Sequence, residues 1–218
     1  MAGENPWSEQ GPPKGAKVKG KRSSNGSNNR RPFTEEEAKA FLQALDEGVD
    51  RDVSMLVSVS GMRVEEACSV LRSDVTEGRG GVTWLQITDA KTEAGKRKVP
   101  VVDAKVRAML HKRVTASHGK KSAPVFPELP VDRFGDRSKP LVKRLGRTLR
   151  GLGMTDPALV AGHSWRHRAR TLMEAAEVAP WTADYLIGHA RPGEGLGRYS
   201  RPSEEQLIKA VKAVPLPV

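Results

Sequence analysis

The sequence is poor in cysteine, in aromatic residues and in long apolar runs, and these scarcities exclude whole classes of protein. Cys68 is the single cysteine among 218 residues, so an internal disulfide framework and a multi-cysteine zinc site are excluded. No apolar run approaches the roughly 20 residues that span a bilayer, and the N-terminus has no signal-peptide core. We therefore expect an intracellular, cytoplasmic protein in a reducing compartment, long enough for one ordinary domain.

Acidic residues are too few to balance the basic ones. Lys and Arg number 37, Asp and Glu number 26, and the formal charge is +11. A surplus of this size favours a polyanionic partner, most often nucleic acid and less often an anionic membrane face.

Residues 1–31 differ in composition from the rest of the chain. Gly, Pro, Ser, Asn and Lys dominate, and Val18 is the only Ile, Leu, Val or Phe. Such a segment buries too little apolar surface to offset its ordering entropy, so we expect a disordered tail. Seven basic residues against Glu4 and Glu9 leave it a net charge of +5. It is either a solvated tail or a basic arm that adds phosphate contacts.

From Pro32 the pattern is that of a globular domain. Thr34 and Glu37 form a capping box at the start of a helix. The apolar stretch 53–59 is typical of a buried helix, and a further helix is expected over residues 64–71.

A hairpin follows in the middle of the chain. Residues 82–88 and 97–102 predict its two strands, and the polar stretch 91–96 predicts its turn. Asp103 can cap a helix that runs to about residue 114. Further helices are expected near residues 138–150, 163–177, 180–187 and 203–214. The fold class is therefore mainly α with a small antiparallel β-sheet (α+β).

Six residues suited to phosphate chemistry stand at the edges of these elements: Arg63, Lys91, His163, Arg166, His189 and Tyr199. The motifs that hold them resemble those of the tyrosine recombinases, the phage integrase family, over about residues 32–214. In chain order the resemblance rests on an arginine box (61–66), a hairpin lysine (90–92), a His-x-x-Arg box (163–166), a Leu-Gly-His box (186–189) and a tyrosine at the place of the nucleophile. Five motifs in the right order are specific, although each alone is weak.

The resemblance implies a role for each residue of the set. Tyr199 would attack a DNA phosphate and form a 3′-phosphotyrosyl bond. Arg63 and Arg166 would hold the non-bridging oxygens, because each guanidinium offers a planar fork of donors. Lys91 would be the general acid that protonates the leaving 5′ oxygen.

Two histidines and a glutamate complete the implied site. His163 and His189 would donate hydrogen bonds to the phosphate, and His163 could also take the proton of the nucleophile. Glu66, one helical turn after Arg63, would orient the cations. The phosphotyrosyl ester stays reactive because a phenol is a better leaving group than an alkyl alcohol. No metal or other cofactor is therefore expected.

Several residues near the proposed catalytic set have more than one possible interpretation. Lys96, Arg97 and Lys98 on the same hairpin are either DNA-backbone contacts or solvated charges. His163 and His167 are four residues apart, but without an intervening Glu or a nearby Cys we expect no metal there. Tyr185 stands in an apolar helix and is expected in the core.

The expected function is site-specific recombination or integration of double-stranded DNA, performed by a homotetramer on DNA, with no membrane and no small-molecule substrate involved. A topoisomerase of the type IB class and a decayed, non-catalytic DNA-binding protein are the alternatives. Family members usually carry a helical core-binding domain before the catalytic domain (residues 32–218 here), so we expect a fragment or a minimal enzyme. The helix over 203–214 either packs on its own domain or docks on a neighbouring protomer.

Overall fold

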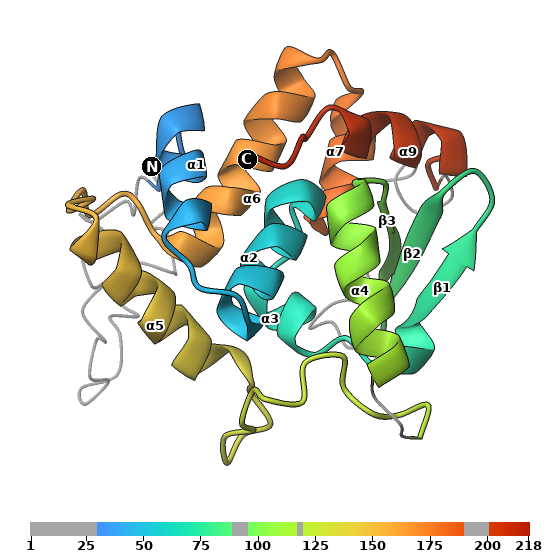
Figure 1. The fold of residues 1–218 in the computed structure, drawn as a ribbon. Coiled ribbons are helices and arrows are strands. Elements are labelled where there is room, and N and C mark those ends of the chain that lie inside the picture. Colours follow the sequence, from blue (N-terminus) through green and yellow to red (C-terminus); the bar gives the residue numbers. More distant parts are fainter. Residues whose placement is uncertain (1–29, 89–95, 117–119, 190–200) are drawn as a thin grey trace, which may run out of the picture.

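The computed structural model describes residues 30–88, 96–116, 120–189 and 201–218. The elements in these ranges are α1 (Glu35–Gln43), α2 (Val49–Ser60), α3 (Val64–Cys68), the 3-10 helix η1 (Arg72–Asp74), β1 (Val75–Gly78), β2 (Val82–Ile87), β3 (Arg97–Val101), α4 (Ala104–Ala116), α5 (Ser138–Gly151), α6 (Ala161–Ala175), α7 (Pro180–Ile187) and α9 (Glu204–Lys212). The three strands form one antiparallel sheet in the order β1-β2-β3 at one side of the helices (Figure 1). The predicted α+β class is confirmed.

Local sequence signals account for the ends of several helices. The Thr34 hydroxyl accepts a hydrogen bond from the backbone N–H of Glu37 at 3.2 Å, and the Glu37 carboxylate accepts one from the backbone N–H of Thr34 at 3.0 Å. This reciprocal pair is the predicted capping box, and it starts α1. Asp103 Oδ1 likewise accepts the backbone N–H groups of Lys105 and Val106, which confirms the predicted cap of α4.

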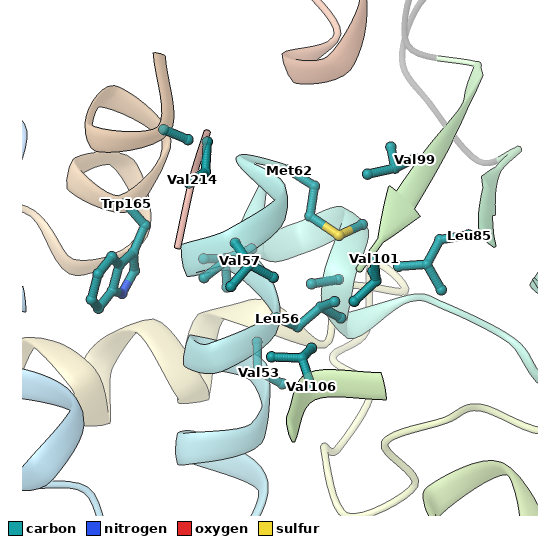
Figure 2. Packing of buried hydrophobic residues seen from close by; sticks show 14 of the residues in the cluster. Val53, Leu56, Val57, Met62, Leu85, Val99, Val101, Val106, Trp165 and Val214 are labelled. Atoms are coloured by element: carbon teal, nitrogen blue, oxygen red, sulfur yellow. The ribbon is translucent and has the colours of Figure 1, made fainter. Parts of the chain in front are cut away.

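The core is built around α2. Leu56 and Val57 on this helix are fully buried, and Figure 2 shows them between Trp165 of α6 and Val101 of β3. The apolar stretch that predicted a buried helix is therefore the centre of the domain. Trp165 is fully buried as well, so the hydrophobic effect holds α6 and the sheet against opposite sides of one helix.

Two element predictions were incomplete. The helix predicted over residues 64–71 ends at Cys68, and η1 follows it. The hairpin prediction missed β1, which pairs with β2 in the register Val75↔Leu85. β1 is a four-residue edge strand without a buried face, so it lacks the alternation by which strands are identified.

The boundary predicted after residue 31 needs correction. The Arg31 guanidinium donates to both carboxylate oxygens of Glu37 at 2.7 Å and to Asp156 at 2.6 Å. Its backbone N–H also bonds to the carbonyl of Ala158. Arg31 is therefore part of the folded domain, whereas residues 1–29 lie outside the described ranges.

The C-terminal segment packs on its own domain. Leu207 and Val211 of α9 are buried, and α9 contacts α7 and β3. Beyond the helix, Val214 and Leu216 are buried, and the Pro215 carbonyl accepts a hydrogen bond from Arg168 of α6. Of the two roles considered for the helix over 203–214, packing on its own domain is the one seen here. No helix in the described part of the chain has the length and apolar character to cross a membrane.

Candidate active site

The structure describes four of the six predicted catalytic residues, together with the supporting Glu66. Lys91 and Tyr199 lie outside the described residues, and so do residues 91–95 of the turn predicted over 91–96. The described four come from three separate segments: Arg63 precedes α3, His163 and Arg166 lie on α6, and His189 follows α7.

The Arg63 side chain bonds to α3 and to the C-terminal end of α7. Its guanidinium Nη1 donates to Glu66 Oε1 at 2.9 Å, and its Nη2 donates to the carbonyl of Gly188 at 3.1 Å. Its backbone N–H donates to the other oxygen of Glu66 at 2.9 Å. The side chain nevertheless remains 42% exposed. The Arg63 guanidinium is therefore fixed in orientation although its side chain is only partly buried.

Arg166 is buried, and its charge is only partly compensated. Its Nη1 donates to the carbonyl of Gly61 at 3.3 Å, whereas its buried Nη2 has no hydrogen-bond partner among the described residues. Burial, followed by the positive charge of Arg63, lowers the pKa of Arg166 to about 9. A buried donor without an acceptor is costly, so an anionic oxygen placed here would be strongly stabilised.

Glycines allow the three segments to approach closely. A Cβ at Gly61 would lie 2.9 Å from Ala169 Cβ on α6 and 3.2 Å from Ile187 Cγ2 on α7. A Cβ at Gly162 would lie 2.9 Å from Val64 Cγ2. The end of α2, the start of α3 and the start of α6 therefore pack backbone to side chain, which brings the Arg63 and Arg166 segments together.

The two histidines of the set are exposed at the rim of this cationic group. The His189 backbone N–H donates to the Asp184 carbonyl at 2.9 Å, and its Nδ1 lies 4.0 Å from an Asp184 carboxylate oxygen. Partial burial, followed by the charge of Arg166, lowers the pKa of His189. Partial burial, followed by the charge of Arg30, lowers the pKa of His163. Both rings are therefore neutral at pH 7, and a neutral imidazole can accept a proton.

Arg97 does not fit the prediction that it contacts DNA or stands as a solvated charge. Its side chain is 0% exposed and forms an ion pair with Glu66. Val99 and Val101 of the same strand are buried, and the alternation of β3 places Arg97 on their side. This alternation was the signal that sequence reasoning overlooked. Lys96 and Lys98 are exposed, and Lys98 Nζ lies 3.8 Å from Glu204.

Two other predicted positions lie as follows. His167 is exposed one turn after His163, and in the described ranges no group of three or more His, Cys, Asp or Glu is placed to hold a metal ion. The Tyr185 ring is partly buried against the core, and its hydroxyl accepts the backbone N–H of Lys98 at 3.4 Å.

A basic helix face escaped sequence reasoning. α5 contains no acidic residue, and its buried face consists of Leu141, Leu145 and Leu149. Its exposed residues include four cations at helical spacing: Lys139, Lys143, Arg147 and Arg150. Spacings of three and four residues place these side chains along one face of the helix. The leucine period of α5 could have revealed this face.

Comparisons with known proteins found a matching family and similar solved structures. The family described as "Phage integrase family" matches residues 31–206. Two similar solved structures are complexes of the XerH site-specific recombinase with its difH substrate. The pre-cleavage complex has a TM-score of 0.56 at 18% identity and covers 74% of this chain and 48% of that one. The post-cleavage complex, with a palindromic difH substrate, has a TM-score of 0.57 at 17% identity and covers 78% and 49%.

At these identities the structural matches establish the fold alone. This chain spans about half the length of each of the two recombinase chains. No curated protein matches it.

Proposed function

The chain belongs to the phage integrase family, and we propose that it is a tyrosine site-specific recombinase that breaks and rejoins double-stranded DNA. The XerH structures to which it is similar are complexes with a DNA substrate before and after cleavage. They support DNA as the partner of this chain, and we propose a homotetramer on DNA as the working assembly.

The observation that carries the proposal is the guanidinium pair at the meeting point of α2, α3 and α6. Arg63 is fixed by Glu66 and Gly188, and Arg166 keeps a buried N–H without an acceptor among the described residues. A phosphodiester moves negative charge onto its non-bridging oxygens as it becomes pentavalent. Fixed donors at that position stabilise the transition state more than the ground state. An arginine with a merely solvated charge would not be buried as Arg166 is.

The proposed covalent step exchanges one phosphorus–oxygen bond for another. The Tyr199 phenol oxygen attacks phosphorus, the bond from phosphorus to the 5′ oxygen breaks, and a 3′-phosphotyrosyl ester forms. Lys91 gives a proton to the departing 5′ oxygen. His163, whose ring is neutral at pH 7 because its pKa is lowered, takes the proton of the phenol. Attack by the 5′ hydroxyl of another strand reverses the step, so no external energy source is consumed.

Exposed cations on two parts of the chain are proposed to contact the DNA backbone. Lys143, Arg147 and Arg150 of α5, and Lys96 and Lys98 of the hairpin, can neutralise DNA phosphates. Such contacts release counterions, so DNA binding should weaken steeply as salt is raised. A flat salt response would contradict the assignment of these cations to DNA.

Trapping the covalent intermediate tests the function directly. A library of nicked duplexes with randomised flanks should yield a covalent protein–DNA adduct with the wild-type chain, because the nicked fragment diffuses away and prevents rejoining. Tyr199→Phe should abolish the adduct, whereas Tyr185→Phe, the other tyrosine of the chain, should preserve it.

Three outcomes separate the alternatives. DNA binding without any adduct would favour the decayed, non-catalytic protein. Relaxation of supercoiled DNA without transfer to a foreign strand would favour the topoisomerase reading. An adduct that persists in Tyr199→Phe would refute the nucleophile.

A further inference from the structure

Arg97 lies on β3 and bonds to residues of both α3 and α7. It is the first residue of β3. Its Nε donates to the carbonyl of Leu186 at 2.7 Å, and its Nη1 and Nη2 donate to the two oxygens of Glu66 at 3.1 and 2.8 Å. One fully buried guanidinium thus joins the hairpin, the arginine box and the Leu-Gly-His box.

The close packing around Gly188 shows how tightly this guanidinium is enclosed. Gly188 has φ +63, and a Cβ there would lie 2.6 Å from Arg97 Nη1 and 3.4 Å from Arg63 Nη1. Any side chain at this position would displace one of the two arginines. The glycine of the Leu-Gly-His box therefore gives the Arg97 guanidinium room beside that of Arg63.

Glu66 is the group through which Arg97 reaches the candidate phosphate site. Its carboxylate is almost fully buried and accepts hydrogen bonds from both Arg97 and Arg63. Burial would raise the pKa of Glu66, but the hydrogen bonds and charge of Arg97, together with the hydrogen bonds of Arg63, outweigh it, so the pKa lies below its ordinary value. Glu66 is thus a fixed anion whose two oxygens are shared between two guanidinium groups.

This sharing determines how much positive charge the site retains. Arg63, Arg97 and Arg166 interact with the single buried carboxylate of Glu66. Three cations against one anion leave two positive charges. Without Arg97 one would remain, and the freed oxygens of Glu66 would compete with a phosphate for the Arg63 fork.

We propose that Arg97 is a positioning residue, which neutralises and orients Glu66 so that the Arg63 guanidinium is presented to the scissile phosphate. This inference rests on the proposed strand-cleaving function. It requires no contact between Arg97 and DNA, in keeping with the full burial of its side chain.

The first test is the rate of adduct formation at saturating DNA. Arg97→Met removes the charge and the fork of donors but keeps most of the length of the side chain. We expect the rate of adduct formation to fall about 10-fold to 100-fold, the range seen when a residue that orients a metal ligand through a hydrogen bond is replaced. Arg97→Lys keeps the charge but cannot reach Glu66 with a fork and Leu186 together, so we expect a smaller fall. DNA affinity should change little in either variant.

The matched control is Arg113→Met. Arg113 is a largely buried arginine on α4, away from the proposed machinery, and it forms ion pairs with Asp52 of α2 and with Glu128. This variant should lose stability but keep the cleavage rate per folded molecule. A loss of rate equal to that of Arg97→Met would mean that any buried ion pair supports cleavage, and would overturn the proposal.

A double-mutant cycle tests the route through Glu66. If Arg97 acts through Glu66, the rate of Arg97→Met combined with Glu66→Gln should lie close to that of the slower single variant. Multiplication of the two single effects would overturn the proposed route. Unchanged saturating cleavage with weakened DNA binding would instead make Arg97 a binding residue.

Binding of inorganic phosphate gives a readout that does not require cleavage. Titration followed by the imidazole NMR signals of His163 and His189 should show weaker phosphate binding in Arg97→Met, and in Arg97→Lys if the first variant does not fold. Equal phosphate affinity in the wild type and the folded variant would overturn the inference. A wild-type chain that binds phosphate but never forms an adduct would refute the proposed function, while the phosphate comparison still decides the role of Arg97.

Discussion

Gly61 must both adopt a left-handed backbone conformation and leave room for α6 and α7, and replacing it by alanine tests these two requirements. Gly61 ends α2 with φ +64, a left-handed conformation that costs an alanine about 1 kcal/mol or more. The added Cβ would also lie 2.9 Å from Ala169 Cβ and 3.2 Å from Ile187 Cγ2. Overpacking of this kind costs about 1–3 kcal/mol. We therefore expect Gly61→Ala to lower the free energy of unfolding by about 2–4 kcal/mol.

Gly153 provides the matched control. It has φ +75, and a Cβ there would meet nothing within 4 Å. Gly153→Ala should therefore show the conformational cost alone, about 1 kcal/mol. Urea unfolding followed by tryptophan fluorescence measures both variants, and the excess loss in Gly61→Ala reports the collision with α6 and α7.

Gly61→Ala should also lower the activity of the candidate active site. The Gly61 carbonyl accepts a hydrogen bond from Arg166, and α6 and α7 lead to Arg166 and His189. A shift of either helix would misplace these groups, so adduct formation per folded molecule should fall in Gly61→Ala and stay unchanged in Gly153→Ala. Equal stability and equal cleavage in the two variants would refute the reasoning that close packing at Gly61 assembles the site.

Two further predictions concern pH and the C-terminus. The pKa values of His163 and His189 are lowered in the folded chain, whereas the unfolded chain takes up these protons near pH 6.5, so the free energy of unfolding should fall as pH drops below about 6.5. Urea titrations at several pH values measure this dependence, which should be smaller in His189→Gln. An unchanged pH dependence in that variant would exclude His189 as its source. Ending the chain before Ser203 removes buried side chains that include Leu207 and Val211, and burial of each contributes about 1.5–3 kcal/mol. Circular dichroism should therefore show that the shortened chain is unfolded. A shortened chain that folds but no longer assembles on DNA would instead favour docking of this helix on a neighbouring protomer.

Local signals in the sequence were sufficient to predict most of the helices and strands. The Thr34 capping box, the apolar stretch of α2 and the Asp103 cap act over a few residues, and each stands where the pattern predicted it. The arginine, His-x-x-Arg and Leu-Gly-His boxes were recognised by their resemblance to a known family, and the family match over residues 31–206 confirms that the chain belongs to it.

The predictions that needed correction depend on residues far apart in the chain. β1 is recognisable as a strand only because β2 lies beside it. Arg31 resembles the tail by composition, yet it belongs to the domain because Asp156 comes within 2.6 Å. The role of α9, which the sequence left open between two alternatives, also depends on distant residues, because the helix contacts α7 and β3.

Arg97 shows most clearly where sequence reasoning stops. Between Lys96 and Lys98 it is one of three consecutive cations, and their place on the predicted hairpin assigned all three either to DNA-backbone contacts or to solvated charges. Residue types and their order led to the proposed chemistry, because a basic chain carries arginines, histidines and a tyrosine in an order that resembles the recombinases. Tertiary structure decided which charges meet, because the energy of a guanidinium depends on the acceptors that folding places around it. Glu66 lies 31 residues before Arg97 and Leu186 lies 89 residues after it.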